Sequence, residues 1–95
     1  MKIVWLPQAR GNRMNLIAYI AQENPRTALD QLDEIEQQTE RLIQYPEMGR
    51  VGRKRGTREL VINRTPFVLV YRVQLKLQRI EILRFLHGAQ QWPPI

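Results

Sequence analysis

The first half of the chain has the hydrophobic pattern of a short strand followed by two helices. Residues 2–6 are β-branched and aromatic, which predicts a strand that ends at Pro7. Apolar positions recur at helical spacing over residues 8–23, at Ala9, Leu16, Ile17, Ile20 and Ala21. Asn24-Pro25 ends this helix and can cap a second one. That helix is predicted to run to Gln44, with an apolar stripe of Leu29, Leu32, Ile35, Thr39, Leu42 and Ile43.

The second half has the two-residue alternation of strands. Glycines at 49, 52 and 56 frame a run of basic residues, which predicts an exposed basic loop. Strands are predicted over 58–63, 67–73 and 78–86. In the middle strand one face carries Phe67, Leu69, Tyr71 and Val73. In the last strand we expect Ile80, Ile82 and Arg84 on one face, and on the other Glu81, Leu83 and Phe85.

The order of these elements predicts an α+β fold. An N-terminal strand precedes an antiparallel helical hairpin, and a three-stranded antiparallel sheet follows, with the hairpin on one face of the sheet. A chain of 95 residues is long enough for one domain, which we expect to span residues 1–95.

Charge is distributed unevenly along the chain. Residues 1–48 contain five basic and seven acidic side chains, whereas residues 49–95 contain ten basic side chains and only Glu59 and Glu81. The net charge is +6. A cluster of this kind favours a polyanionic target, an acidic protein partner, or both.

Several classes of chemistry are excluded by composition. The chain has no cysteine and one histidine, so we expect no metal site. No P-loop or dinucleotide fingerprint is present, so no cofactor is expected. The absence of serine excludes a Ser-His-Asp site. No signal peptide or membrane span is visible, and we expect a cytoplasmic protein without a membrane partner.

The remaining candidates for chemistry are His87 and the arginines. His87 with Arg58, Arg72 and Arg84 could form a nuclease site, with the histidine as general acid and the arginines as phosphate ligands. The alternative is a structural His87 at the end of the last strand. The loop of residues 50–58 could bind a phosphate backbone or an acidic protein, and Trp92 could stack on a base or pin the C-terminal tail.

Five short segments resemble the RelE/ParE toxin superfamily, and more closely its ParE branch. They are residues 19–25 (YIAQENP), 45–50 (YPEMGR), 56–60 (GTREL), 69–73 (LVYRV) and 80–87 (IEILRFLH). The resemblance implies the fold predicted above and a cognate antitoxin with a DNA-binding N-terminal domain and a flexible, acidic C-terminal segment. ParE-like toxins poison DNA gyrase, whereas RelE-like toxins cut mRNA in the ribosome. RelE-like nucleases tend to have an arginine where this chain has Val68, which counts against cleavage.

We therefore predict the toxin of a type II toxin–antitoxin system that inhibits gyrase by binding. Its predicted target-binding residues are Arg50, Arg53, Lys54, Arg55, Arg58, Arg84, His87 and Trp92, and its predicted antitoxin-binding residues are Leu16, Ile17, Ile20, Tyr71 and Arg72. Reversing Arg53 and Arg55 to Glu should abolish toxicity without unfolding the domain. The alternatives are a ribosome-dependent mRNA endonuclease that uses His87, Arg58, Arg72 and Arg84, and a non-toxic remnant that still binds an antitoxin.

Overall fold

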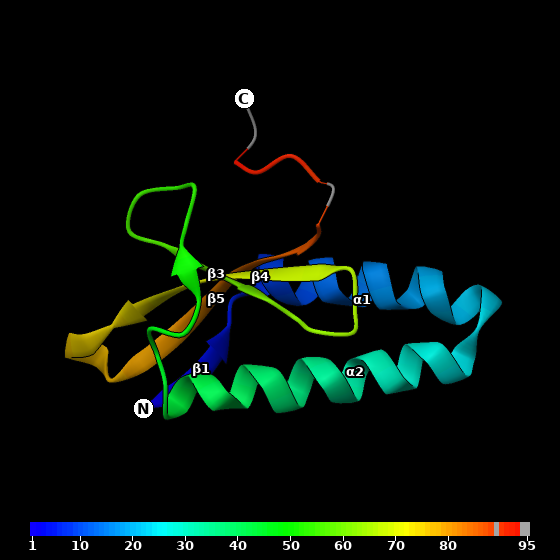
Figure 1. The fold of residues 1–95 in the computed structure, drawn as a ribbon, viewed down its shortest axis with the longest axis horizontal. Coiled ribbons are helices and arrows are strands. Elements are labelled where there is room, and N and C mark those ends of the chain that lie inside the picture. Colours follow the sequence, from blue (N-terminus) through cyan, green and yellow to red (C-terminus); the bar gives the residue numbers. More distant parts are fainter. Residues whose placement is uncertain (89, 94–95) are drawn as a thin grey trace.

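The computed structural model describes residues 1–88 and 90–93. Its elements are β1 (Lys2–Trp5), α1 (Pro7–Glu23), α2 (Pro25–Glu40), β2 (Arg50–Val51), β3 (Arg58–Val61), β4 (Phe67–Gln74) and β5 (Arg79–His87), with short 3-10 turns at Arg41–Ile43 and Leu75–Leu77. The predicted α+β class is confirmed (Figure 1). None of the described helices is long and apolar enough to cross a membrane.

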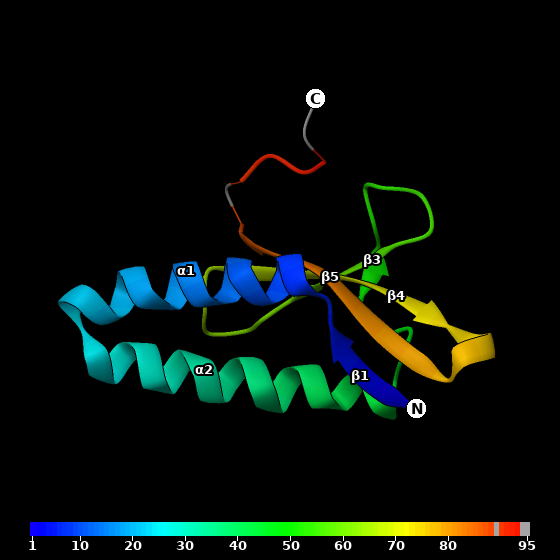
Figure 2. The same ribbon diagram turned by 180° about the vertical axis from the view of Figure 1, so that it is seen from behind.

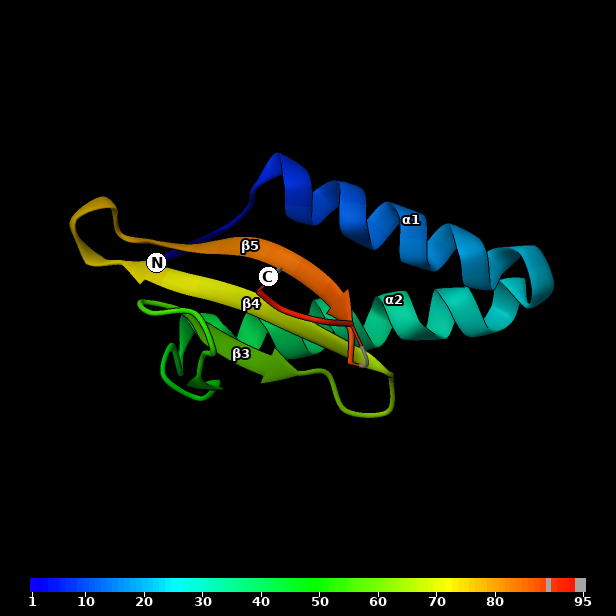
Figure 3. The ribbon, with the colours of Figure 1, turned by 90° about the horizontal axis from the view of Figure 1, so that it is seen from above.

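The two helices form the expected antiparallel hairpin (Figure 3). Pro7 and Pro25 each stand in the first turn of a helix, where the missing N–H leaves no intrahelical bond unmade. The Asn24 side chain accepts a hydrogen bond of 3.1 Å from the Thr27 backbone N–H and so caps α2. The helix ends at Glu40, and the last predicted turn tightens into a 3-10 turn.

The sheet has five strands in the order β1-β5-β4-β3-β2, so the prediction of a three-stranded antiparallel sheet was too small. β1 joins the sheet at its edge and runs parallel to β5 (Figure 2). The short β2 pairs antiparallel with β3 within the stretch predicted as a loop. The N-terminal strand itself was predicted and is confirmed as β1, but its pairing with the distant β5 was not predicted. The two-residue β2 is too short for local alternation to detect.

One face of the sheet packs against the helices and forms the main core. The buried core residues include Ala9, Ile17, Ala28, Ile35, Leu42, Ile62, Phe67, Leu69, Tyr71, Ile80, Ile82 and Phe85. We call this the inner face. The predicted apolar stripe of α2 is confirmed at Ile35, Thr39 and Leu42, whereas Leu29 is 60% exposed and Ile43 is 41% exposed.

A β-bulge in β5 changes which residues share a face. Val70 of β4 is opposite Arg84, but the next residue, Tyr71, is opposite Ile82. The extra residue, Leu83, shifts the alternation by one position. Phe85 therefore lies in the inner core with Ile82, and the predicted grouping of Arg84 with Ile82 was wrong.

Part of the opposite, outer face of the sheet is covered by the chain's own C-terminal tail. Val70, Leu86 and Trp92 form a second, smaller buried cluster, with Leu83 packed against it. The tail crosses β4 and β5 on the side away from the helices (Figure 3), and the loop between β2 and β3 projects on the same side as the tail (Figure 1). Two segments from the basic half of the chain are thereby brought to one face.

Candidate functional site

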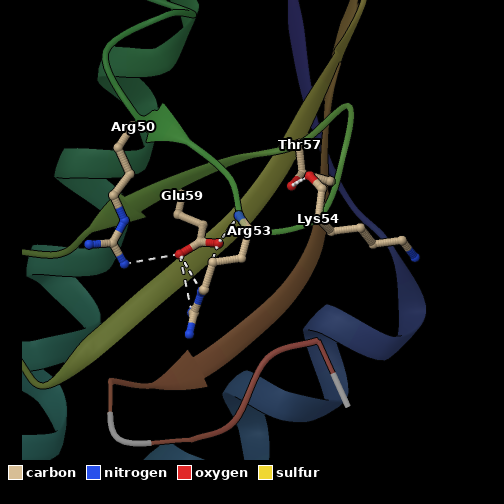
Figure 4. Close-up of polar contacts among 5 residues, drawn as sticks. All are labelled: Arg50, Arg53, Lys54, Thr57 and Glu59. Carbon is tan, nitrogen blue, oxygen red and sulfur yellow. Dashed lines mark hydrogen bonds and ion pairs between the residues drawn. The ribbon is translucent and has the colours of Figure 1, made fainter. Parts of the chain in front are cut away.

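The basic loop of residues 50–57 is held to the sheet by one buried carboxylate. The Glu59 side chain on β3 is fully buried and accepts hydrogen bonds from the Arg50 guanidinium (2.9 Å), from the Arg53 guanidinium (3.2 Å) and from the Arg53 backbone N–H (2.8 Å) (Figure 4). Burial alone would raise the pKa of Glu59, but the bonds from Arg53 and Arg50 outweigh it and hold the pKa below its usual range. Glu59 is therefore an anion buried beneath two arginines.

Backbone contacts close the same loop. Gly52 N–H donates to the Thr57 carbonyl at 2.8 Å, and Thr57 donates to the Lys54 carbonyl through both its backbone N–H and its hydroxyl. A Cβ at position 52 would lie 2.8 Å from the Thr57 carbonyl oxygen, so the close approach of the two loop ends requires glycine. The basic loop is thus a defined turn with Lys54 and Arg55 exposed.

Lys54 and Arg84 both lie beside the indole ring of Trp92. The Lys54 ammonium is 5.9 Å from the ring centroid and the Arg84 guanidinium is 5.3 Å from it, both within the range of cation–π attraction. Trp92 is only 7% exposed, and its indole N–H has no hydrogen-bond partner among the described residues. The structure therefore brings together three of the eight predicted target-binding residues, Lys54, Arg84 and Trp92. Arg58 and His87, which are opposite Tyr71 and Phe67, lie on the inner side of the sheet instead.

A second buried carboxylate, that of Glu81, binds the arginines at the other end of the outer face. Glu81 on β5 accepts hydrogen bonds of 2.7 Å from Arg72 and from Arg79, and a weaker one from Gln74. The bond from Arg72 is the largest influence on the pKa of Glu81, which is lowered despite the burial of the carboxyl. Arg72, predicted as an antitoxin contact or a phosphate ligand, is thus already bound to Glu81.

Arg58 does not join the rest of the basic loop. It follows Thr57 and precedes Glu59, so its side chain lies on the opposite side of β3 from Glu59. Its guanidinium donates to the Gly49 carbonyl at 2.8 Å and so supports the turn before β2. Tyr71, its cross-strand partner, supports the same turn, accepting from Gly49 N–H and donating to the Pro46 carbonyl. Burial raises the pKa of Tyr71.

The four residues of the nuclease alternative are not gathered at one point. Arg58 and Arg72 line one hollow of about 400 Å³. His87 is opposite Phe67, five residues before Arg72 on β4. At about 3.4 Å per residue, His87 therefore lies roughly 17 Å along the strand from that hollow. His87 also lies at the far end of the sheet from Glu81, so it is separated from the clustered arginines of that end.

The five predicted antitoxin-binding residues lie in three different environments. Leu16, Ile17 and Ile20 of α1 pack against the inner core, and Tyr71 is completely buried within it. Arg72 points from the outer face. In the chain on its own these residues form no common surface. The three residues of α1 and Tyr71 lie on the inner side of the sheet, whereas Arg72 lies on the outer side.

An apolar groove between β1 and α2 was missed from the sequence. Its volume is about 790 Å³, and its lining includes Ile3 and Trp5 from β1 with Leu29, Leu32 and Ile43 from α2 and the turn that follows. Arg13 lies over the Trp5 ring, 4.2 Å from its centroid. Leu29 and Ile43 both belong to the apolar stripe predicted from the sequence, yet both are exposed at the groove. An apolar stripe wider than the core can cover is therefore the sequence signal for this groove.

The residues that sequence reasoning overlooked are Glu59 and Glu81. They are the only acidic residues of the basic half, and both lie in strands, which is the signal that could have identified them.

Within residues 1–88 and 90–93, no group of three or more His, Cys, Asp or Glu could hold a metal ion. The exposed arginines that Glu59 and Glu81 hold in position can bind anions or an acidic protein surface.

Comparisons with known proteins agree on one family. The family model described as "ParE toxin of type II toxin-antitoxin system, parDE" matches residues 3–92. A protein of Sinorhizobium fredii named "Putative toxin Y4kP" is 34% identical over 94 residues, which cover 99% of this chain and 95% of that protein. A solved structure titled "Chromosomal ParDE TA system from P. aeruginosa" is similar with a TM-score of 0.80 and 26% identity, covering 92% of this chain and 95% of the other.

Proposed function

Because the chain belongs to the ParE toxin family of type II toxin–antitoxin systems, we propose that it inhibits DNA gyrase by binding, with no catalytic residue of its own. The strongest support is the ordered basic loop, in which Glu59 and the Gly52–Thr57 contact hold Lys54 and Arg55 in an exposed position. A loop that is ordered before binding loses less conformational entropy when it meets its target.

The placement of His87 favours binding over catalysis. A general acid must lie within hydrogen-bond reach of the reacting group, and phosphate ligands must converge on the same atom. The register of β4 and β5 separates His87 from Arg58 and Arg72 by several residues. Those arginines also hold Gly49 and Glu81, so they already have structural roles.

The family implies an antitoxin partner, and we propose that the antitoxin's acidic C-terminal segment occupies the groove between β1 and α2. β1 is an edge strand paired only with β5, so an extended peptide can add to its free edge. Lys2 and Arg13 can pair with acidic side chains of the segment, whereas Asp33, Glu36 and Glu40, which also line the groove, favour apolar or basic side chains beside α2. Leu29→Asp should weaken antitoxin binding by about tenfold or more while leaving gyrase inhibition intact; unchanged affinity in calorimetry would rule out this groove.

The direct test combines purified toxin with gyrase, supercoiled plasmid and ATP. We expect linear DNA to accumulate after treatment with detergent and protease. The double variant Lys54→Ala/Arg55→Ala should lose this effect, whereas Arg10→Ala/Arg26→Ala, with the same net charge, should retain it. No linear DNA from folded protein would overturn the proposal, and cleavage of mRNA on ribosomes by the same preparation would replace it.

The structure also changes which arginines are suitable for such a test. Reversing Arg53 and Arg55 was expected to leave the domain folded, but Arg53 donates both side-chain and backbone hydrogen bonds to the buried Glu59. A glutamate at position 53 would place a second carboxylate beside Glu59, and the loop would lose its order. Lys54 points away from Glu59 (Figure 4), and the next residue, Arg55, is exposed, so changing these two residues avoids this problem.

A further inference from the structure

Charge is separated across the thickness of the molecule as well as along the chain. All the acidic side chains that are not buried lie on the helices or at Glu47. Among the described residues, β2, β4 and β5 and the loop between β2 and β3 present seven cations on the outer side, which we call the basic face: Arg50, Arg53, Lys54, Arg55, Arg72, Arg79 and Arg84. The two carboxylates on this face, Glu59 and Glu81, are buried beneath it. An approaching partner therefore meets mainly guanidinium and ammonium groups.

The arginines of the basic face retain free donors. Glu59 accepts one hydrogen bond from Arg50 and three from Arg53, which together occupy both of its oxygens, yet Arg50 uses only one of its nitrogens there. The Arg50 side chain remains 58% exposed and the Arg72 side chain 45% exposed. Each guanidinium has more N–H groups than its carboxylate accepts, so the remaining N–H groups face solvent. Glu59 and Glu81 thus hold the arginines in position, while the N–H groups of the guanidiniums that face solvent stay available to a partner.

Strand register spreads these cations over a defined area. Glu59 and Arg84 are both opposite Val70, on either side of β4, so they lie about 10 Å apart across the sheet. Arg72 lies two residues further along β4, about 7 Å away. Successive phosphates of one DNA strand advance about 3.4 Å along the helix axis, so an array of this size spans roughly three phosphates.

The exposed surface of the basic face is mostly polar, with Val61 of β3 as a 46% exposed apolar exception, and this favours a nucleic acid over a protein. The centre of a protein–protein interface is enriched in apolar and aromatic side chains. On this face the apolar residues Val70 and Leu86 are buried together with Trp92 of the tail. Exposed apolar side chains for a peptide partner lie instead in the groove between β1 and α2, as at Leu29.

We propose that the basic face binds the phosphate backbone of duplex DNA without sequence preference, and that Glu59 is the positioning residue of this surface. The DNA-binding property stands without gyrase. Its cellular role rests on the proposed function, since the toxin would then contact the DNA held by gyrase as well as the enzyme itself. Lys54, Arg55 and Arg84 are the proposed phosphate contacts nearest the tail, and Arg50 and Arg72 extend the surface along the sheet.

The test measures binding of the toxin to a fluorescent duplex of about 20 base pairs by anisotropy at several salt concentrations. The logarithm of affinity should fall linearly with the logarithm of salt concentration, by roughly 0.9 for each phosphate contact. Lys54→Ala/Arg55→Ala should bind at least about tenfold more weakly and with a shallower slope. Arg10→Ala/Arg26→Ala lowers the net charge equally on the helix side and should change affinity by less than about twofold.

A second variant separates positioning from charge. Glu59→Gln makes the protein more basic, yet it should weaken DNA binding several-fold because the loop loses its anchor. Glu40→Gln on α2 adds the same charge and should bind at least as well as the wild type. Circular dichroism confirms that each variant is folded, and the alanine pair still tests the surface should Glu59→Gln unfold.

Three results would overturn the proposal. They are no binding to DNA, equal losses in the two alanine pairs, and binding to poly-glutamate in place of DNA, which would mark the face as a site for acidic protein. DNA binding without any effect on gyrase would support the proposal while removing the proposed function. Gyrase inhibition without DNA binding would do the reverse.

Discussion

The two faces of the sheet are built from the same strands but are stabilised by different interactions. The inner face buries Phe67, Ile82 and Phe85 under the helices, where apolar area removed from water is the main stabilising contribution. The outer face has a small apolar cluster around Val70 and, on either side, a buried carboxylate under two arginines. Stability therefore comes from one face, and an exposed charged surface is available on the other.

The difference shows how a small domain can keep many cations on one side. Seven close cations repel one another, and Glu59 and Glu81 offset that repulsion from beneath. Removing one member of a buried ion pair leaves the other without its partner. The outer face should therefore respond to pH and salt, whereas the inner face should respond to changes in side-chain volume.

The largest effect is expected on the inner face. Phe85 is 1% exposed, and its ring lies 4.9 Å from that of Phe67 and 5.9 Å from that of Trp5. Phe85→Ala should lower the free energy of unfolding by about 3–5 kcal/mol, through lost burial and the cavity left behind. Urea denaturation measures this change. Val61→Ala, on the outer side of β3, should lose less than about 1 kcal/mol, and a loss equal to that of Phe85→Ala would contradict the comparison.

A smaller and pH-dependent effect is expected at the buried carboxylates. The folded pKa of Glu59 and Glu81 is lowered, so in acid the unfolded chain binds protons first, near its usual pKa of about 4.3. Their stabilising contribution is complete above that pH and is lost as the pH falls through the folded pKa. Glu59→Gln should therefore lose about 1–3 kcal/mol at pH 7, and the difference from wild type should shrink below about pH 4.

Urea denaturation at a series of pH values checks this expectation. Glu81→Gln should behave in the same way as Glu59→Gln, because both carboxylates are buried under two arginines. Glu23→Gln, at an exposed position on α1, is the control and should change stability by less than about 0.5 kcal/mol. A constant difference between wild type and Glu59→Gln down to about pH 2 would show that the ionised carboxylate is not what stabilises the loop.

The smallest effect is expected at the tail. Trp92→Ala removes an indole packed on Val70 and Leu86, but the freed tail regains conformational entropy, so the net loss should be about 1 kcal/mol. Thermal unfolding measures the loss. Faster amide exchange, limited to the parts of β4 and β5 that pack against Trp92, should accompany it. A loss as large as that of Phe85→Ala would mean that the outer face is a second core.

Much of the architecture was predictable from short-range patterns. The helical hairpin followed from the spacing of Ile17 and Ile35 and from the Asn24-Pro25 break, and the strands of the second half followed from alternation. The predicted phase of β5 was wrong beyond Leu83, because alternation does not show where a bulge inserts a residue. For the site, Lys54, Arg84 and Trp92 were predicted to share a surface and lie together, whereas His87, predicted with them, lies on the inner side and the role of Glu59 was not predicted.

The sequence by itself determined the α+β class, the basic character of the second half and the family, because these depend on local periodicity, composition and short motifs. Only the tertiary structure decided the rest. Pairing of β1 with β5, the bulge at Leu83 and the burial of Glu59 depend on contacts between residues distant in sequence. Such contacts decide which side chains remain exposed to solvent. They leave an apolar groove on one side of this protein and a basic face on the other.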